Sequence, residues 1–118
     1  MNVLFVCTEN LARSPLAATL FRGLLGGDDR HLVRSAGIAS GAPRRLTTRE
    51  MAWAEVVAVM EEAHLDLIQG HWPDHVKKVV VLGVPDHYEP DEPELRALLA
   101  PKLHVLLEDL DAHSTPAG

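Results

Sequence analysis

Residues 2–25, NVLFVCTENLARSPLAATLFRGLL, decide the fold. They begin with a short, nearly continuous apolar run over residues 2–6, which is typical of a strand buried on both faces of a parallel sheet. Over residues 14–25 leucine and phenylalanine recur at helical spacing, and a glycine pair that ends helices follows. A serine followed by a proline favours a helix that begins at Ser14-Pro15. The stretch therefore predicts a strand, a loop and a helix in succession.

The rest of the chain continues this alternation. Further strands are predicted over residues 31–38, 55–60 and 78–83. Further helices are predicted from Thr47, where Glu50 completes a capping box, over residues 61–70, and over residues 94–110, with a kink or break at Pro101. Such alternation predicts a three-layer α/β/α fold, in which a four-stranded parallel sheet carries helices on both faces. Residues 1–113 are expected to form one domain and residues 114–118 a flexible tail.

Length and composition limit the class of protein. The chain has 118 residues, of which 47% are hydrophobic and 24% charged, an ordinary balance for one globular domain. No apolar run reaches the about 18 residues that a membrane-spanning helix needs. The first residues lack the basic segment of a secretory signal, so we expect a cytoplasmic protein without a membrane partner.

The chain contains one cysteine, Cys7, and has a formal net charge of −6. A lone cysteine excludes an internal disulfide, a cysteine-only zinc site and a relay between two thiols. The acidic balance disfavours nucleic acid as a partner, because affinity for nucleic acid comes from neutralising phosphates. The scattered histidines show no set of three metal ligands. We therefore expect no metal and no cofactor, and any anion site must be built locally.

Residues 7–14, CTENLARS, join the first strand to the first helix and have the form Cys-x5-Arg-Ser. Successive backbone N–H groups of such a loop converge on an anion, and the helix start adds its positive end. The guanidinium of Arg13 binds two phosphoryl oxygens, and the same field favours the nucleophilic thiolate of Cys7. A cysteine at the end of a buried strand is more often a small core residue. The presence of Cys7 at one end of the loop and Arg13 at the other nevertheless favours a phosphate site.

At VLFVCTENLARSPLAATLFR, residues 3–22, the sequence resembles the low-molecular-weight protein tyrosine phosphatases, and it is similar to their short bacterial members. Weaker resemblance continues over residues 35–37, 46–60, 64–67 and 79–99. The resemblance implies a cysteine-dependent phosphomonoesterase, of protein-tyrosine or aryl phosphatase type. Cys7 would form a phosphocysteine intermediate, and Arg13 would bind the equatorial oxygens. Ser14 would hydrogen-bond the thiolate, and Asn10 would hold the shape of the loop.

The family takes its general acid from a loop after the fourth strand, which here reads Pro-Asp-His-Tyr at residues 85–88. Asp86 is therefore the expected acid, which protonates the leaving group and then activates water, and Asp91 is the reserve candidate. Tyr88 is expected to stack on an aromatic substrate or to cover the loop. The expected substrate is a phosphorylated protein or a small aryl phosphate. The expected substrate-binding residues are Thr8, Glu9, Asn10, Leu11, Ala12, Ser14 and Tyr88.

The chain departs from the family pattern at three places. Glu9 stands where these phosphatases have glycine, and its carboxylate is expected to repel phosphate unless it points into solvent. Ala12 replaces a second loop cysteine, which removes a thiol that would protect Cys7 from oxidation. The segment over residues 37–46 is short and is expected to lack the aromatic wall that grips a phosphotyrosine ring.

Two other functions stay open from the sequence. An arsenate reductase shares the Cys-x5-Arg loop, but a chain with one cysteine would need an external thiol. A non-catalytic module that binds phosphate or a phosphoprotein is favoured by Glu9 and by the short segment after Gly37. The sequence does not determine the oligomeric state.

Overall fold

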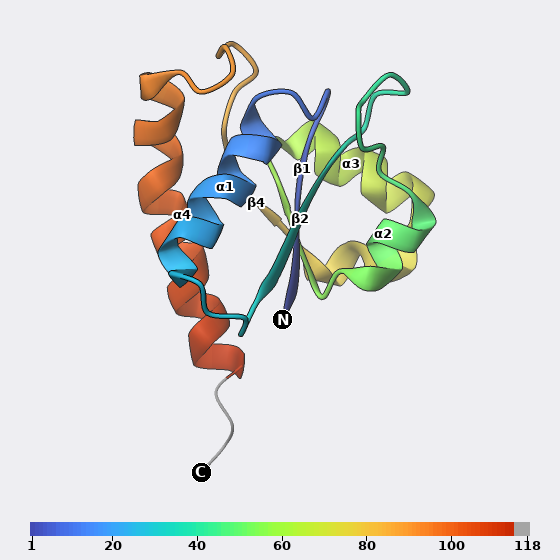
Figure 1. Ribbon diagram of the computed structural model, residues 1–118. Helices are drawn as coiled ribbons and strands as arrows, with labels where there is room; N and C mark the ends of the chain where they lie inside the picture. The colour runs from blue at the N-terminus through green and yellow to red at the C-terminus, as the bar shows by residue number, and fades with distance from the viewer. Residues whose placement is uncertain (115–118) are drawn as a thin grey trace.

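Figure 1 shows the computed structural model, which describes residues 1–114. Strands and helices alternate along the chain. In order they are β1 (Asn2–Cys7), α1 (Arg13–Leu25), β2 (Leu32–Gly37), α2 (Thr48–Trp53), β3 (Val56–Val59), α3 (Glu62–His71), the 3₁₀ helix η1 (Pro73–Lys78), β4 (Val79–Val81) and α4 (Pro93–Ser114).

The strands form one parallel sheet in the order β2-β1-β3-β4. The chain leaves β1 on one side to form β2 and then returns to its other side to form β3. This reversal of strand order opens a crevice at the carboxyl ends of β1 and β3, where ligands bind in folds of this type. Cys7 lies at that end, paired in register with Gly37 of β2.

Each face of the sheet carries one layer of helices (Figure 1). On one face α1 and α4 pack over Val3 and Phe5, and on the other α2 and α3 pack over Leu4 and Val6. These four side chains of β1 are fully buried, and each contributes roughly 1.5–3 kcal/mol by leaving water. The predicted three-layer α/β/α fold is confirmed.

The structure corrects the predicted start of the first helix. α1 begins at Arg13 with Ala12 in the capping position, so Ser14 is not the N-cap and Pro15 is not the first helical residue. The Ser14 hydroxyl lies instead 3.0 Å from the Cys7 Sγ. The capping residue predicted for the second helix is correct, because Thr47 Oγ1 accepts a hydrogen bond of 3.2 Å from the Glu50 N–H. The predicted capping box is not completed, because the Glu50 carboxylate accepts a hydrogen bond from Arg34 instead.

The last two elements also differ from their predicted extents. β4 covers only residues 79–81, and the 3₁₀ helix η1 occupies the chain up to Lys78. α4 continues through Pro101 without a break, and its leucines line the core beneath α1. The helix ends at Ser114, one residue beyond the predicted domain boundary. The rest of the predicted tail, residues 115–118, lies outside the described residues.

Gly37 ends β2 against the loop that follows β1, and a Cβ there would lie 2.7 Å from the Ala42 Cβ and 2.9 Å from the Asn10 Cβ. We expect Gly37→Ala to lower the free energy of unfolding by about 1–3 kcal/mol, because a closely packed site must shift to admit a methyl group. Urea unfolding followed by circular dichroism measures this loss. Gly41→Ala is the matched control, since a Cβ at Gly41 meets nothing within 4 Å. Equal losses in the two variants would contradict the prediction.

Candidate active site

The loop between β1 and α1 folds over the sulfur of Cys7. Cys7 is buried, and Asn10 adopts the left-handed conformation with φ of 58°. Asparagine is among the few residues that tolerate this conformation. The turn directs the Asn10 N–H at the Cys7 Sγ, with a donor–acceptor distance of 3.2 Å. The sulfur thus faces a backbone donor on one side and the Ser14 hydroxyl on the other.

The Asn10 side chain fixes the loop to the neighbouring strand. Its Nδ2 donates to the Ser14 Oγ at 2.9 Å and to the Ser35 Oγ at 3.0 Å. The Ser14 hydroxyl oxygen accepts this hydrogen bond. The hydroxyl can donate its own proton to either of two acceptors, the Cys7 Sγ or the Ala36 carbonyl oxygen. If the sulfur is a thiolate, it accepts that proton as a hydrogen bond, and the anion gains a second donor.

Arg13 is buried, lines the same cavity as Cys7, and is held by several groups. Its Nη1 donates to the Glu61 Oε2 at 2.8 Å and to the Val84 carbonyl at 2.7 Å, while its Nη2 donates to the Thr8 Oγ1 at 3.4 Å. Nη2 also lies 3.6 Å from an Asp86 carboxylate oxygen. The guanidinium plane is therefore fixed at Nη1, and the Nη2 side faces Asp86.

Glu61 and His64 support this arrangement, although the sequence predicts a site role for neither of them. The Glu61 N–H donates to the His64 Nδ1 at 3.1 Å, so the ring proton of a neutral His64 is on Nε2 and is donated to the Thr8 Oγ1 at 2.9 Å. Burial, and next the positive charge of Arg13, lower the pKa of His64 below its usual value. A neutral imidazole thus positions Thr8.

A cavity of about 340 Å³ opens above the sulfur. The predicted site residues that line it are Cys7, Glu9, Leu11, Ala12, Arg13, Asp86 and Tyr88, and Glu89 and Pro90 complete the wall. Thr8, Asn10 and Ser14 do not line the cavity. Thr8 accepts a hydrogen bond from Arg13, and Asn10 and Ser14 contact the sulfur. Asp91 is not a lining residue of this cavity, and it forms an ion pair with Arg96.

Comparison with known proteins agrees with this geometry. The family model for low molecular weight phosphotyrosine protein phosphatase matches residues 2–81. The chain belongs to this family. It is a phosphatase, as the sequence predicts.

Solved structures resemble this phosphatase over nearly its whole length. A YwlE mutant from Bacillus subtilis is 26% identical, with a TM-score of 0.79 over 94% of this chain and 99% of that one. The YwlE arginine phosphatase, as a cysteine-to-serine mutant with a phosphorylated active site serine, is 25% identical, with a TM-score of 0.81 over 97% and 98% of the two chains. The tyrosine phosphatase Wzb from Escherichia coli K30, in complex with phosphate, is 24% identical, with a TM-score of 0.77 over 92% and 97%. No curated protein sequence matches the chain.

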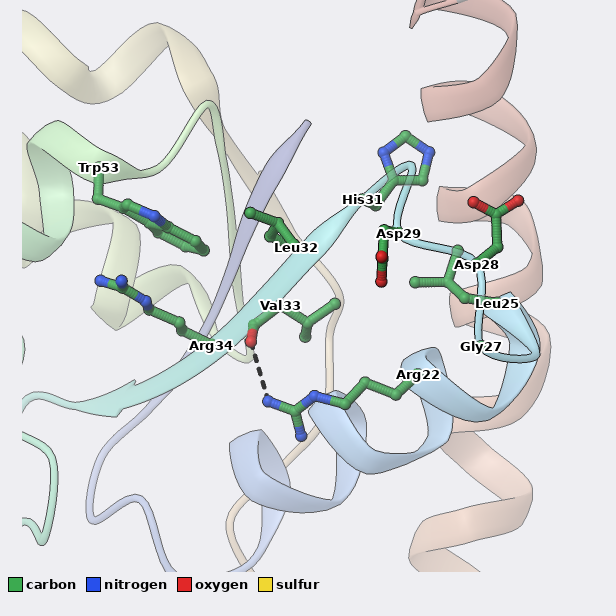
Figure 2. A pocket seen from close by; sticks show the side chains of 10 residues that line it. All are labelled: Arg22, Leu25, Gly27, Asp28, Asp29, His31, Leu32, Val33, Arg34 and Trp53. Atoms are coloured by element: carbon green, nitrogen blue, oxygen red, sulfur yellow. Dashed lines mark hydrogen bonds between the residues drawn. The ribbon is translucent and has the colours of Figure 1, made fainter.

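A second cavity, of about 430 Å³, lies at the opposite end of the sheet (Figure 2). Its arginines are already engaged, since Arg22 donates to the Val33 carbonyl at 2.9 Å and Arg34 stacks over the Trp53 ring at 4.1 Å. No cysteine, serine or threonine lines it. Within residues 1–114 no group of three His, Cys, Asp or Glu side chains is placed to hold a metal ion. The cavity above Cys7 is therefore the candidate active site.

His64 is expected to make stability depend on pH. Because its pKa in the folded protein lies below the usual 6.5, the unfolded chain binds this proton more readily. The contribution of His64 is therefore fully present above pH 6.5 and is lost as the pH falls from there through the lowered folded pKa. We expect His64→Gln to reduce the fall in unfolding free energy between about pH 7.5 and about pH 5.5, as measured by urea unfolding.

The matched control is His104→Gln, which makes the same change at an exposed position of α4. This variant should keep the pH dependence of the unmodified protein more closely than His64→Gln does. The same pH dependence in His64→Gln and in the unmodified protein would contradict the lowered pKa of His64.

Proposed function

We propose that this phosphatase hydrolyses phosphate monoesters through a phosphocysteine formed on Cys7. The observation that supports this most directly is the setting of the sulfur. It lies at the floor of the cavity, between the Asn10 N–H and the Ser14 hydroxyl, beside the guanidinium of Arg13 and near the start of α1. A donor, a cation and a helix start would together bind the phosphoryl group of a substrate placed against the sulfur.

In the first step the Cys7 thiolate attacks phosphorus. The sulfur–phosphorus bond forms as the bond from phosphorus to the ester oxygen breaks, and Asp86 gives its proton to the departing oxygen. Asp86 suits this role because its side chain is 62% exposed at the cavity wall, where it reaches both the leaving group and solvent. Its carboxylate lies 3.6 Å from the Arg13 Nη2.

In the second step a water molecule attacks the phosphocysteine. Asp86, now ionised, takes a proton from this water, and the sulfur leaves as a thiolate that the Ser14 hydroxyl stabilises by a hydrogen bond. Inorganic phosphate is released. Arg13 binds the equatorial phosphoryl oxygens in both steps, where charge develops in the transition state. Glu61 and Val84 hold the other side of the guanidinium, so that it is oriented before substrate arrives.

The proposed substrates are a phosphorylated protein or a small aryl phosphate. Tyr88 and Leu11 line the cavity and offer an apolar surface for a phosphotyrosine ring. Because the similar structures include YwlE, which is described as an arginine phosphatase, phosphoarginine peptides belong in the same assays. We also propose a cytoplasmic location, since a nucleophilic thiol needs a reducing compartment. No helix within residues 1–114 is long and apolar enough to cross a membrane.

The other two functions have less support. Reduction of arsenate would need an external thiol, because Cys7 is the chain's one cysteine. A non-catalytic module would need Cys7 and Asp86 only for packing, yet both line the cavity together with Arg13.

Substitution of Cys7 and Arg13 tests the proposed chemistry. We expect Cys7→Ser to reduce kcat for 4-nitrophenyl phosphate by about 1,000-fold or more, without added metal, because it removes the nucleophile. Arg13→Lys keeps the charge but loses the planar fork, so it should also reduce kcat strongly. Arg22→Lys is the matched control, since Arg22 lies at the far cavity of Figure 2. Phosphate binding without turnover by the unmodified protein would favour the non-catalytic module, and thiol-dependent loss of arsenate would favour the reductase.

Asp86 and Asp91 are distinguished by the leaving group. We expect Asp86→Asn to slow phenyl phosphate hydrolysis by about 100-fold or more and 4-nitrophenyl phosphate hydrolysis much less, because a poor leaving group depends on protonation. Asp91→Asn should show no such difference, since Asp91 is paired with Arg96. If steady-state kinetics give the leaving-group dependence with Asp91→Asn instead, Asp91 is the general acid.

A further inference from the structure

The wall of the catalytic cavity has two electrostatic zones. The cation of Arg13 lies at the floor, buried, and is partly compensated by Glu61. The wall above it carries the exposed carboxylates of Glu9, from the loop after β1, and Glu89, from the loop after β4. Within residues 1–114 neither of these two carboxylates forms an ion pair, and no lysine and no second arginine lines the cavity.

This division has different consequences for the two parts of a substrate. The phosphoryl group goes to the floor, where Arg13, backbone N–H groups and the start of α1 compensate its charge. The groups next to it lie along the wall, where an acidic residue would be repelled by two carboxylates and a basic residue attracted by them. Because Glu9 and Glu89 both line the cavity and are exposed, both would act on the part of a substrate that extends out of it.

The surface beyond the cavity has room for a polypeptide. A second groove, of about 320 Å³, shares Leu11, Ala12 and Pro90 with the cavity and continues over Pro15 and Leu16 at the start of α1. The charged residues of this groove, Asp91 and Arg96, neutralise each other. The groove is thus mainly apolar, and its ion pair is neutral overall. Glu9 and Glu89, the carboxylates without an ion-pair partner among the described residues, line the cavity and not the groove.

We propose that Glu9 and Glu89 are specificity-determining residues, which select phosphorylated polypeptides with lysine or arginine beside the phosphorylated residue and reject those with acidic neighbours. This inference rests on the proposed function, since it assigns the substrate class of the same site. It gives Glu9 a role in substrate choice rather than in the chemical steps.

The test compares two phosphotyrosine peptides that differ only in whether arginine or glutamate flanks the phosphotyrosine on both sides. We expect kcat/KM to favour the arginine peptide by about 10-fold at low ionic strength, since several exposed charge pairs each contribute a few-fold. Glu9→Gln combined with Glu89→Gln should reduce this ratio to about 2-fold, and salt should reduce it in the unmodified protein. Glu108→Gln is the matched control, because it removes one exposed carboxylate from the far part of α4 and should leave the ratio unchanged.

A second measurement keeps this test independent of turnover. Calorimetry with Cys7→Ser gives the ratio of the two peptides' dissociation constants, which should show the same preference and the same loss in the Glu9 and Glu89 variants. Equal kcat/KM values with normal hydrolysis of 4-nitrophenyl phosphate would overturn the charge selectivity alone. No hydrolysis of any ester would overturn the proposed function, and the affinity ratio would then decide the selectivity. A preference seen only with phosphoarginine, and not with flanking arginine, would also overturn it.

Discussion

A charged guanidinium buried beside a thiol is the constraint on which the site depends. Arg13 is almost fully removed from solvent, and an uncompensated charge there would strongly destabilise the fold. Its compensation comes from Glu61 after β3 and from the Val84 carbonyl after β4, while Thr8 follows β1. Only a parallel arrangement brings these three carboxyl ends to one edge of the sheet. The position of the Arg13 side chain therefore depends on the strand order. A change in the pairing of β3 would move Glu61 and Val84 away from the guanidinium.

The sequence predicts the local part of the structure well, because strand and helix patterns and the Cys-x5-Arg loop are written in consecutive residues. The family resemblance points to Asp86 in the loop after the last strand, and this residue does line the cavity with Cys7 and Arg13; residues that only the folded sheet brings near could not be predicted in this way. Glu61, His64 and Ser35 are such residues, since their role depends on side chains about 20–60 positions away. Two roles compete for the Ser14 hydroxyl, helix capping and a hydrogen bond to the sulfur, and the sequence pattern does not decide between them. Serine is a good helix cap, yet here its hydroxyl bonds the sulfur, and the helix starts one residue earlier without a side-chain cap.

The acidic net charge of the chain is also found at the cavity, where three carboxylates and one arginine are among the lining residues. In the proposed mechanism, the anion is bound by one arginine, by backbone N–H groups and by the start of a helix. The exposed Glu9 and Glu89 at the cavity have the opposite charge, so a phosphoryl group would meet favourable potential only after it had passed these carboxylates. Asp86 belongs to both zones, because its carboxylate is exposed at the wall and also lies near the Arg13 Nη2. In the proposed mechanism, proton transfer would therefore take place at the boundary between the two zones, where Asp86 reaches both solvent and the cavity.

The phosphate loop is not a self-contained module. Its Cys7 and Thr8 carbonyls accept hydrogen bonds from the Ile38 and Ala39 N–H groups, Ser35 holds the Asn10 amide, and Gly37 leaves room for Asn10 to turn. These residues lie at the end of β2 and just beyond it, outside the loop's own sequence. Grafting residues 7–14 onto another strand–helix unit would therefore not transplant the anion site unless the end of the adjacent strand were moved with it. In protein design or in evolution, residues 7–14 and the end of β2 would therefore have to be transferred together.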